Sequence, residues 1–179
     1  VDGIEQKVVV TGGKPAVFDV VNAESGDYLF SFDLGLQNVI ESIDPATGDK
    51  RIAAGITPGD GESKFVCPHA GGAKSWPPSA LNPDTNILFI PLNESCMTLQ
   101  QVMPGGRGSL STGVNWRLRP RLDSDGNYGR LEAVNLNTRE SIWVHRQRAP
   151  RTTGVLATAG GVVFAGDLAR GFAAYDDRT

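Results

Sequence analysis

A short pattern that recurs five times is the sequence feature that most constrains the fold of this chain. Each copy has a small or apolar residue, any residue, Asp or Asn, two further residues, Thr or Ser, usually Gly, and an apolar residue four positions later. The copies comprise Val20, Asn22, Ser25, Gly26 and Phe30; Ser42, Asp44, Thr47, Gly48 and Ile52; Ala80, Asn82, Thr85, Asn86 and Ile90; Ala133, Asn135, Thr138, Arg139 and Trp143; and Ala174, Asp176 and Thr179. A register shared by five segments indicates one repeated structural unit.

The chemistry of this register is that of a β-hairpin turn. An Asp or Asn side chain accepts hydrogen bonds from the backbone two residues further on, and Gly or Asn then adopts the left-handed conformation that reverses the chain. The flanking residues alternate or run apolar, as strands do, at 8–10, 16–21, 28–32, 87–91, 130–136 and 161–165. The pattern therefore predicts an all-β protein built as a ladder of hairpins.

The spacing of the copies favours a β-propeller. Their Asp or Asn residues stand at positions 22, 44, 82, 135 and 176, and a four-stranded propeller blade takes about 40 to 45 residues. Irregular spacing suits blades with insertions between them, and the 22 glycines and 11 prolines suit many tight turns. We expect Trp143 to pack between blades. A β-sandwich with similar turns is the less favoured alternative.

The two ends of the sequence suggest an incomplete ring of blades. Val1 comes directly before a predicted strand, and Thr179 falls inside the fifth turn. An open arc of blades exposes apolar faces and unpaired strand edges. We therefore expect residues 1–179 to form one partial propeller domain, truncated at both ends, which needs the remainder of the propeller from a separate chain or from self-association.

Charge gives no reason to expect nucleic acid as a partner. The formal net charge is −3, with 17 basic and 20 acidic residues. The arginine-rich stretch 139–151 contains Trp143 but lacks the regular interleaving of aromatic residues that base stacking needs, so we expect a solvated strand and loop there. The sequence contains no apolar run of membrane-helix length and no signal-peptide pattern at its start. We expect that Val1 is not the first residue of a precursor.

The residues that most often carry chemistry are few. Cys67 and Cys96 are compatible with free thiols, a disulfide or half of a metal site. His69 and His145 have no Ser, Cys or carboxylate at a triad-like relation in the sequence, which argues against nucleophilic catalysis. The acidic segment 123–127 has Val134 where a calcium loop needs Glu, so we expect a hydrophilic turn.

Two segments resemble a known family beyond the repeat itself. The first runs from Cys67-Pro68-His69-Ala70-Gly71-Gly72 through Lys74-Ser75-Trp76-Pro77-Pro78 to Cys96-Met97. The second contains Gly129-Arg130-Leu131-Glu132-Ala133 and the run Leu156-Ala157-Thr158-Ala159-Gly160-Gly161, followed by Val163-Phe164 and Gly166. Both are similar to segments of the pyrroloquinoline-quinone (PQQ) dependent alcohol dehydrogenases. With the opening segment around Lys14, the resemblance covers nearly the whole chain.

This resemblance implies an eight-bladed propeller in the bacterial periplasm, with PQQ and a calcium or lanthanide ion on its axis. Enzymes of this family oxidise alcohols to aldehydes and pass the electrons to cytochrome c or to membrane quinone. Cys67 and Cys96 match a structural disulfide of the family, and the periplasm is oxidising enough to keep one.

The resemblance also assigns cofactor contacts. Lys14 stands where family members place Arg or Lys beside the quinone oxygens, and Ser75 stands where many relatives have an Asn that contacts the cofactor. Trp76 is expected either to line the cofactor site or to fill a blade core. Thr152 stands where relatives often place a Trp, and it offers no stacking surface. PQQ is a flat, anionic quinone, so cations, hydroxyl donors and aromatic planes suit it.

The family's remaining catalytic groups have no counterpart between Val1 and Thr179. These are the catalytic Asp, the carboxylates that bind the metal ion, the ring of adjacent cysteines over the cofactor and the Trp beneath it. We therefore expect the chain to be incomplete as an enzyme and to bind neither PQQ nor metal alone. A non-catalytic propeller that binds proteins is the alternative function, and a gene remnant or nicked product is a third possibility.

Overall fold

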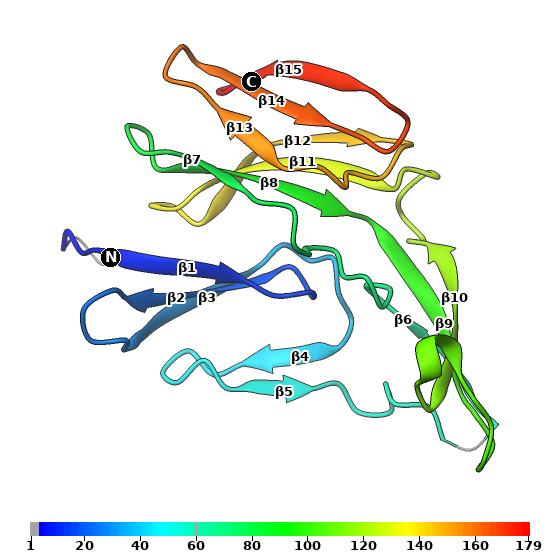
Figure 1. The fold of residues 1–179 in the computed structure, drawn as a ribbon. Coiled ribbons are helices and arrows are strands. Elements are labelled where there is room, and N and C mark those ends of the chain that lie inside the picture. The colour runs from blue at the N-terminus through cyan, green and yellow to red at the C-terminus, as the bar shows by residue number, and fades with distance from the viewer. Residues whose placement is uncertain (1–3, 60) are drawn as a thin grey trace. The chain divides into compact units, whose positions relative to one another are not determined.

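The computed structural model describes residues 4–59 and 61–179, and their regular structure is antiparallel β-strand apart from the short 3₁₀ helix η1 (Ser109–Ser111) (Figure 1). The expected all-β class is confirmed. The chain divides into two compact units: residues 4–59, 61–73 and 95–121 form the first, and Lys74–Glu94 with Leu122–Thr179 form the second. Among the described residues, no helix is long and apolar enough to span a bilayer.

The first unit contains three small sheets. One has the strand order β1 (Val8–Gly12), β2 (Val17–Asn22) and β3 (Tyr28–Asp33). The second pairs β4 (Ile40–Ile43) with β5 (Lys50–Ile52), and the third has the order β10 (Val114–Pro120), β9 (Ser95–Gln101) and β6 (Ser63–Val66). The rings of Phe18 and Phe32 stack across β2 and β3, with centroids 5.0 Å apart.

The second unit contains a four-stranded and a three-stranded sheet. The larger has the order β12 (Glu140–Gln147), β11 (Gly129–Asn135), β8 (Ile87–Asn93) and β7 (Ala80–Asn82). The smaller has the order β13 (Val155–Ala157), β14 (Val162–Gly166) and β15 (Phe172–Asp176). Among the described strands, only those of the larger sheet reach the four of a complete blade. All six strands expected from the sequence are present, with ends shifted by one or two residues.

The repeated register forms the same turn in all five copies. In each copy the Asp or Asn side chain accepts a hydrogen bond from the backbone nitrogen two residues further on, at 2.8 Å for Asn22, Asp44, Asn135 and Asp176 and 3.1 Å for Asn82. The reversing residue is left-handed, with φ of 79° at Gly26 and 54° at Asn86. Arg139, with φ of 65°, shows that the turn also imposes this conformation on a residue that disfavours it.

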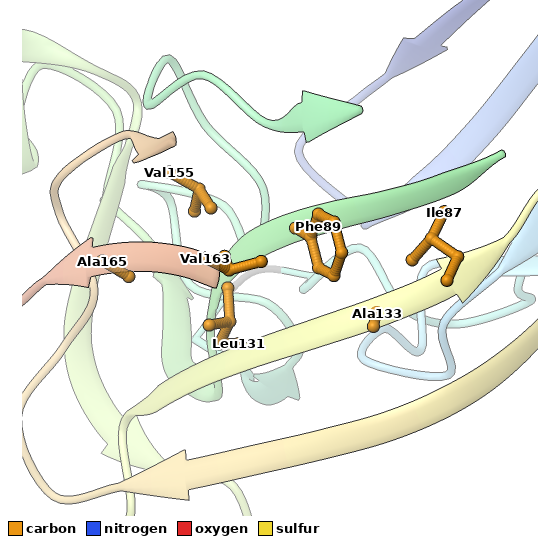
Figure 2. Close-up of a cluster of buried hydrophobic side chains, with 7 residues drawn as sticks. All are labelled: Ile87, Phe89, Leu131, Ala133, Val155, Val163 and Ala165. Carbon is orange, nitrogen blue, oxygen red and sulfur yellow. The ribbon is translucent and has the colours of Figure 1, made fainter. Parts of the chain in front are cut away.

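A buried apolar cluster joins the two sheets of the second unit. It comprises Ile87, Phe89, Leu131, Ala133, Val155, Val163 and Ala165 (Figure 2). Trp143 packs against it, with its ring 5.9 Å from that of Phe89 and 6.2 Å from that of Tyr175 on the other sheet. Trp143 Nε1 also donates to Asp177 O at 3.3 Å. The prediction that Trp143 packs between two sheets of the repeat is confirmed.

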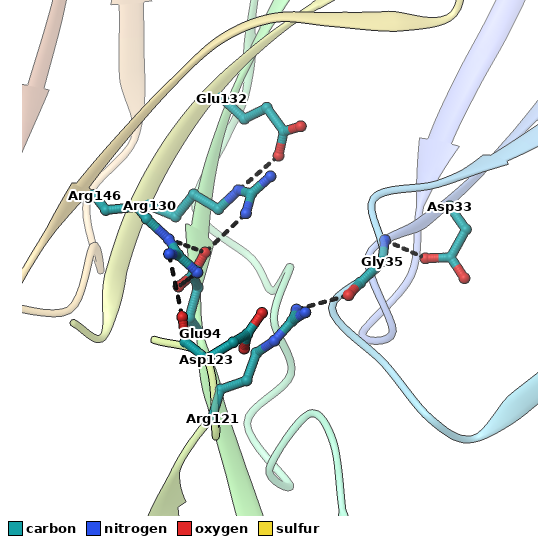
Figure 3. Close-up of polar contacts among 8 residues, drawn as sticks. All are labelled: Asp33, Gly35, Glu94, Arg121, Asp123, Arg130, Glu132 and Arg146. Carbon is teal, nitrogen blue, oxygen red and sulfur yellow. Dashed lines mark hydrogen bonds and ion pairs between the residues drawn. The ribbon is translucent and has the colours of Figure 1, made fainter. Parts of the chain in front are cut away.

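A charged network lies at one end of the larger sheet. Glu94, which has no exposed side-chain surface, accepts a hydrogen bond from Arg130 Nη1 at 2.8 Å and one from Arg146 Nε at 3.0 Å (Figure 3). Arg146 Nη2 lies 2.7 Å from the other oxygen of Glu94 as an ion pair, although its orientation does not give a hydrogen bond. Arg130 also binds Glu132 at 2.8 Å. Pairing of this kind offsets the cost of burying the charges.

The expectation of a solvated arginine-rich segment at 139–151 is wrong for two of its arginines. Arg146 belongs to the network around Glu94, and Arg151 is only 1% exposed. Arg151 Nη2 donates to the hydroxyl of Tyr175 at 2.6 Å, and its guanidinium lies 5.3 Å from the centre of that ring. The partners of both arginines are distant in sequence, so a local charge pattern could not reveal them.

Candidate functional site

The loop that follows β6 carries the first segment identified in the sequence. Cys67 and Cys96 form a disulfide, with Cα atoms 4.2 Å apart, that ties the end of β6 to the start of β9. This result selects one of the three states that the sequence left open. Closing a loop of this length stabilises the folded state by about 3 kcal/mol through the entropy of the unfolded chain.

Asn38 holds the start of the same loop, a role that the sequence analysis missed. Its Oδ1 accepts from Cys67 N at 2.8 Å, its Nδ2 donates to Phe65 O at 3.0 Å, and its own backbone nitrogen donates to Cys67 O at 3.0 Å. The loop is therefore fixed by a covalent bond and by three hydrogen bonds from one side chain and its backbone.

Lys14 lies in the turn between β1 and β2 and reaches this loop. Its Nζ donates to Ala70 O at 2.8 Å, and its carbonyl oxygen accepts from Ala73 N at 2.8 Å. The side chain is exposed, and an ammonium group has three N–H donors. Because one of these donors is used by Ala70, the other two remain for a ligand. Lys14 is thus held in place at the protein surface, which differs from the mobile lysine of an ordinary turn.

His69, in the same loop, is the second residue that sequence reasoning undervalued. Its Nδ1 lies 2.8 Å from Ser95 Oγ, and either atom can be the donor. Burial lowers the pKa of His69, and the charge of Lys14 lowers it further. The imidazole is therefore neutral at pH 7. A side chain at Gly71 would collide with this ring, since an added Cβ would lie 2.5 Å from Nε2.

The contact between His69 and Ser95 is one that the sequence did not indicate. The two residues are 26 positions apart, so no sequence motif connects them. Ser95 is 5% exposed, and within residues 4–59 and 61–179 neither side chain bonds to a carboxylate. A nucleophile must reach its substrate and a base must be oriented by a third group. The contact between His69 and Ser95 instead helps to hold the loop in place.

The second unit carries the remaining predicted residues on the segment that begins at Lys74. Lys74 is 8% exposed, and its Nζ donates to Ser75 O at 2.7 Å and to Pro77 O at 2.5 Å. Burial lowers the pKa of Lys74. These two bonds curl the backbone around the ammonium group and fix residues 75–77.

The side chains on this curled segment are available for contacts. Trp76 is 81% exposed, which excludes the alternative that it fills a blade core within its unit. Ser75 is half-buried, and its hydroxyl makes no hydrogen bond with any residue in the described part of the chain. An exposed indole face and a free hydroxyl are the features that a flat ring with polar edges requires.

The segment containing Thr152 lies beside the same loop. Val155 N donates to Pro78 O at 3.1 Å, and an added Cβ at Gly154 would lie 2.7 Å from Pro78 Cγ. Thr152 itself is half-buried. The second unit therefore brings the segments of Ser75, Trp76 and Thr152 together, while Lys14 and the disulfide belong to the first unit.

No potential metal centre is found among residues 4–59 and 61–179, in the sense of three or more His, Cys, Asp or Glu side chains grouped around one point. Of the donors described above, the exposed ammonium group of Lys14 in the first unit is suited to a ligand with electron-rich oxygens.

Comparison with known proteins places the chain in context. No family model matches it. The quinoprotein alcohol dehydrogenase PedH of Pseudomonas putida is 31% identical over 176 residues, a match that covers 92% of this chain and 28% of PedH. The chain thus spans little more than a quarter of this relative's length.

Two solved structures share the fold. A quinohemoprotein alcohol dehydrogenase from Comamonas testosteroni matches with a TM-score of 0.85 and 25% identity, over 100% of this chain and 28% of that chain. A europium-containing methanol dehydrogenase matches with a TM-score of 0.87 over 99% of this chain and 31% of that chain. Its identity of 21% makes this second likeness one of fold alone.

Proposed function

Since the chain is homologous to one stretch of the PQQ-dependent alcohol dehydrogenases, we propose that residues 1–179 form part of the propeller of such an enzyme and supply one wall of its cofactor site. The observation that best supports this proposal is the geometry of Lys14. Its exposed ammonium group is held by a hydrogen bond to Ala70 O, and its two other N–H donors are available to a ligand. This proposal includes two statements: these residues are one part of a larger propeller, and they contribute cofactor contacts to its reaction.

Three side chains are proposed to contact the cofactor in the complete enzyme: Lys14 from the first unit, and Ser75 and Trp76 from the second. Lys14 donates hydrogen bonds to the quinone oxygens and stabilises negative charge as it develops there. Ser75 donates one hydrogen bond through its free hydroxyl, and Trp76 offers its exposed indole face to the ring. PQQ supplies the two-electron oxidation of the alcohol when it is bound. Thr152 provides no aromatic surface, so the wall differs here from that of relatives with Trp.

The rest of the machinery is proposed to come from other parts of the propeller, which these 179 residues do not include. These parts supply the catalytic Asp, the ligands of a calcium or lanthanide ion and the remaining cofactor contacts. The complete enzyme oxidises alcohols to aldehydes and passes the electrons to cytochrome c or membrane quinone. The disulfide supports a periplasmic location, because such bonds persist in oxidising compartments.

Complementation tests this proposal directly. The purified chain is mixed with the N-terminal part of PedH that precedes the matched region, together with PQQ, ethanol, an electron-accepting dye and either Ca²⁺ or La³⁺. We expect dye reduction in the mixture and none with either polypeptide alone. Failure of the two parts to associate calls for the same measurement with both joined in one chain. No activity in that folded fusion would contradict the proposal and favour a protein-binding propeller.

Substitution of Lys14 tests its role within the active mixture. We expect Lys14→Ala to lower kcat by about 100-fold, the scale seen when one donor to a developing anion is removed. Lys14→Arg retains most of the activity, because it keeps a cation and its donors. Lys7→Ala, an exposed lysine of the same unit, is the matched control and leaves kcat unchanged. Equal kcat values for the Lys14→Ala and Lys7→Ala mixtures would remove Lys14 from the site.

A further inference from the structure

One face of the sheet formed by β6, β9 and β10 carries a row of hydrogen-bond donors. Side chains alternate between the two faces of a strand, so Asn115, Arg117 and Arg119 of β10 share a face. The cross-strand partners of Asn115 and Arg117 on β9 are Gln100 and Thr98, which lie on that face as well. On β10 and β9 the opposite face carries the apolar residues Trp116, Leu118, Met97 and Leu99.

This polar face is hollowed. A groove of about 500 Å³ is lined by Thr98, Gln100, Ser109, Asn115, Trp116, Arg117 and Arg119. None of these lining residues is acidic, and two are cations. The size lies in the range of small-molecule sites, roughly 300 to 1,000 Å³. The groove therefore combines a concave shape with an excess of positive charge.

The two arginines are placed differently within it. Arg119 Nε donates to Thr98 Oγ1 at 2.9 Å, which orients its guanidinium along the sheet. Arg117 forms no hydrogen bond or ion pair with another residue in the described ranges 4–59 and 61–179. Both side chains are exposed, and β10 is an edge strand of its sheet. A ligand can approach both guanidinium groups from solvent.

We propose that this groove binds a small organic or inorganic polyanion with two carboxylate or phosphate groups. Residues two apart on a strand are separated by about 6.6 Å, so one guanidinium can pair with each of two negative groups. The amide side chains of Gln100 and Asn115 donate to the remaining oxygens. This site is separate from the proposed cofactor wall, which contains none of the groove residues.

Arginines on an edge strand also have a simpler role, since their charge opposes pairing with the edge of another sheet. That role requires only exposed charge. It does not explain why two arginines and the amides of Gln100 and Asn115 line the same groove, or why no carboxylate is among the lining residues. The two explanations differ in whether the groove saturates with a ligand.

Isothermal titration of the full 179-residue chain separates them. Citrate and pyrophosphate are the probes with two or more negative groups, and acetate is the probe with one. We expect saturable binding of citrate or pyrophosphate at least tenfold tighter than that of acetate. The tighter of the two identifies the natural ligand's groups as carboxylates or phosphates.

Substitutions that remove one positive charge locate the binding. Arg117→Gln and Arg119→Gln are each expected to weaken binding of the tighter probe at least tenfold, and the double variant abolishes it. Arg148→Gln removes the charge of an exposed arginine outside the groove and changes the affinity less than twofold. Circular dichroism verifies that each variant is folded. Absence of saturable binding, or equal weakening by Arg148→Gln, would overturn the proposal.

Discussion

Two consecutive loops, residues 67–73 and residues 74–78, carry or adjoin the proposed cofactor contacts, but they are fixed by opposite means. The first is held by a disulfide, by Asn38 and by the pair of His69 and Ser95. The second is held by the buried ammonium group of Lys74 and by packing of Pro78 beside Gly154. One loop depends on a covalent bond and on side-chain hydrogen bonds, and the other depends on burial.

The difference lies in what surrounds each loop within its own unit. Residues 74–78 lead into β7 and β8, whose residues Ile87 and Phe89 belong to the apolar cluster between two sheets. Residues 67–73 connect β6 to residues 74–78, and they are held by the disulfide and by individual hydrogen bonds. The orientation of Trp76 should therefore change when the packing of the second unit is disturbed. The orientation of the Ala70 carbonyl, and of Lys14 bonded to it, should change when the disulfide between Cys67 and Cys96 is reduced.

The largest expected effect comes from breaking the packing of the second unit. Phe89 is fully buried and contacts Trp143, so we expect Phe89→Ala to lower the free energy of unfolding by about 3 to 5 kcal/mol. Urea denaturation measures this change. Hydrogen exchange should show faster opening of β8 and β11, with the amides of β9 and β10 much less affected.

Phe172→Ala is the matched control for this substitution. Phe172 is 76% exposed and stacks on Phe164, so its removal should cost less than about 1 kcal/mol. A similar loss of stability for both variants would show that the second unit is not held by its buried cluster, and the contrast between the loops would fail.

The next effect comes from breaking the covalent bond of the first loop. The double variant Cys67→Ser and Cys96→Ser should lose about 2 to 4 kcal/mol, because the unfolded chain regains the entropy of an open loop. Hydrogen exchange at residues 67–73 should rise while β8 and β11 keep their protection. Addition of dithiothreitol to the native chain is the second measurement. Unchanged protection of the loop in the reduced protein would contradict the comparison.

The turns of this fold could be predicted from sequence because their chemistry is local. Asn22, Asp44 and Asn135 each bond to a nitrogen only two residues away. The strands between them followed from alternation, and Trp143 from its place in the register. The pairing of Cys67 with Cys96 came from resemblance to a family rather than from the residues themselves.

The interactions that fix the site could not be predicted, because their partners are distant in sequence. His69 meets Ser95 across 26 positions, and Arg151 meets Asn93 across 58. Lys74 bonds to near neighbours, yet the burial that lowers its pKa comes from the tertiary structure. Charge patterns predict solvation by default, and only the fold shows which charges are buried.

A smaller effect is expected at Lys74, which holds the second loop. Lys74→Met leaves the carbonyl oxygens of Ser75 and Pro77 without their donor, and it also removes a desolvated cation. The two contributions partly cancel, so we expect a net loss of about 1 to 2 kcal/mol. Lys64→Met, which breaks an ion pair with Glu62 near the surface, is the control and should change stability by less than about 0.5 kcal/mol.

The pH dependence of stability distinguishes Lys74 from other lysines. Burial lowers the pKa of Lys74 below its ordinary value of 10.5, so the unfolded chain binds more protons than the folded chain at alkaline pH. The contribution of Lys74 to stability therefore rises with pH up to about 10.5. This rise should be absent in Lys74→Met and present in Lys64→Met. Its persistence in Lys74→Met would show that the ammonium group is not desolvated.

The smallest effect is expected at His69 in the first loop. Burial, and secondly the charge of Lys14, lower the pKa of His69 below 6.5. The unfolded chain then takes up a proton first on acidification, so stability falls as the pH drops below 6.5. The ring is half-buried, and solvent screening limits this loss to less than about 1 kcal/mol.

NMR titration of the imidazole of His69 should give a midpoint below 6.5 that moves upward in Lys14→Gln. His145 also has a lowered pKa, caused by burial and by Arg151, and its midpoint should not respond to Lys14→Gln. If the midpoint of His69 is likewise insensitive, Lys14 does not act on this ring, and the first loop is fixed by its disulfide and Asn38 without a contribution from the lysine.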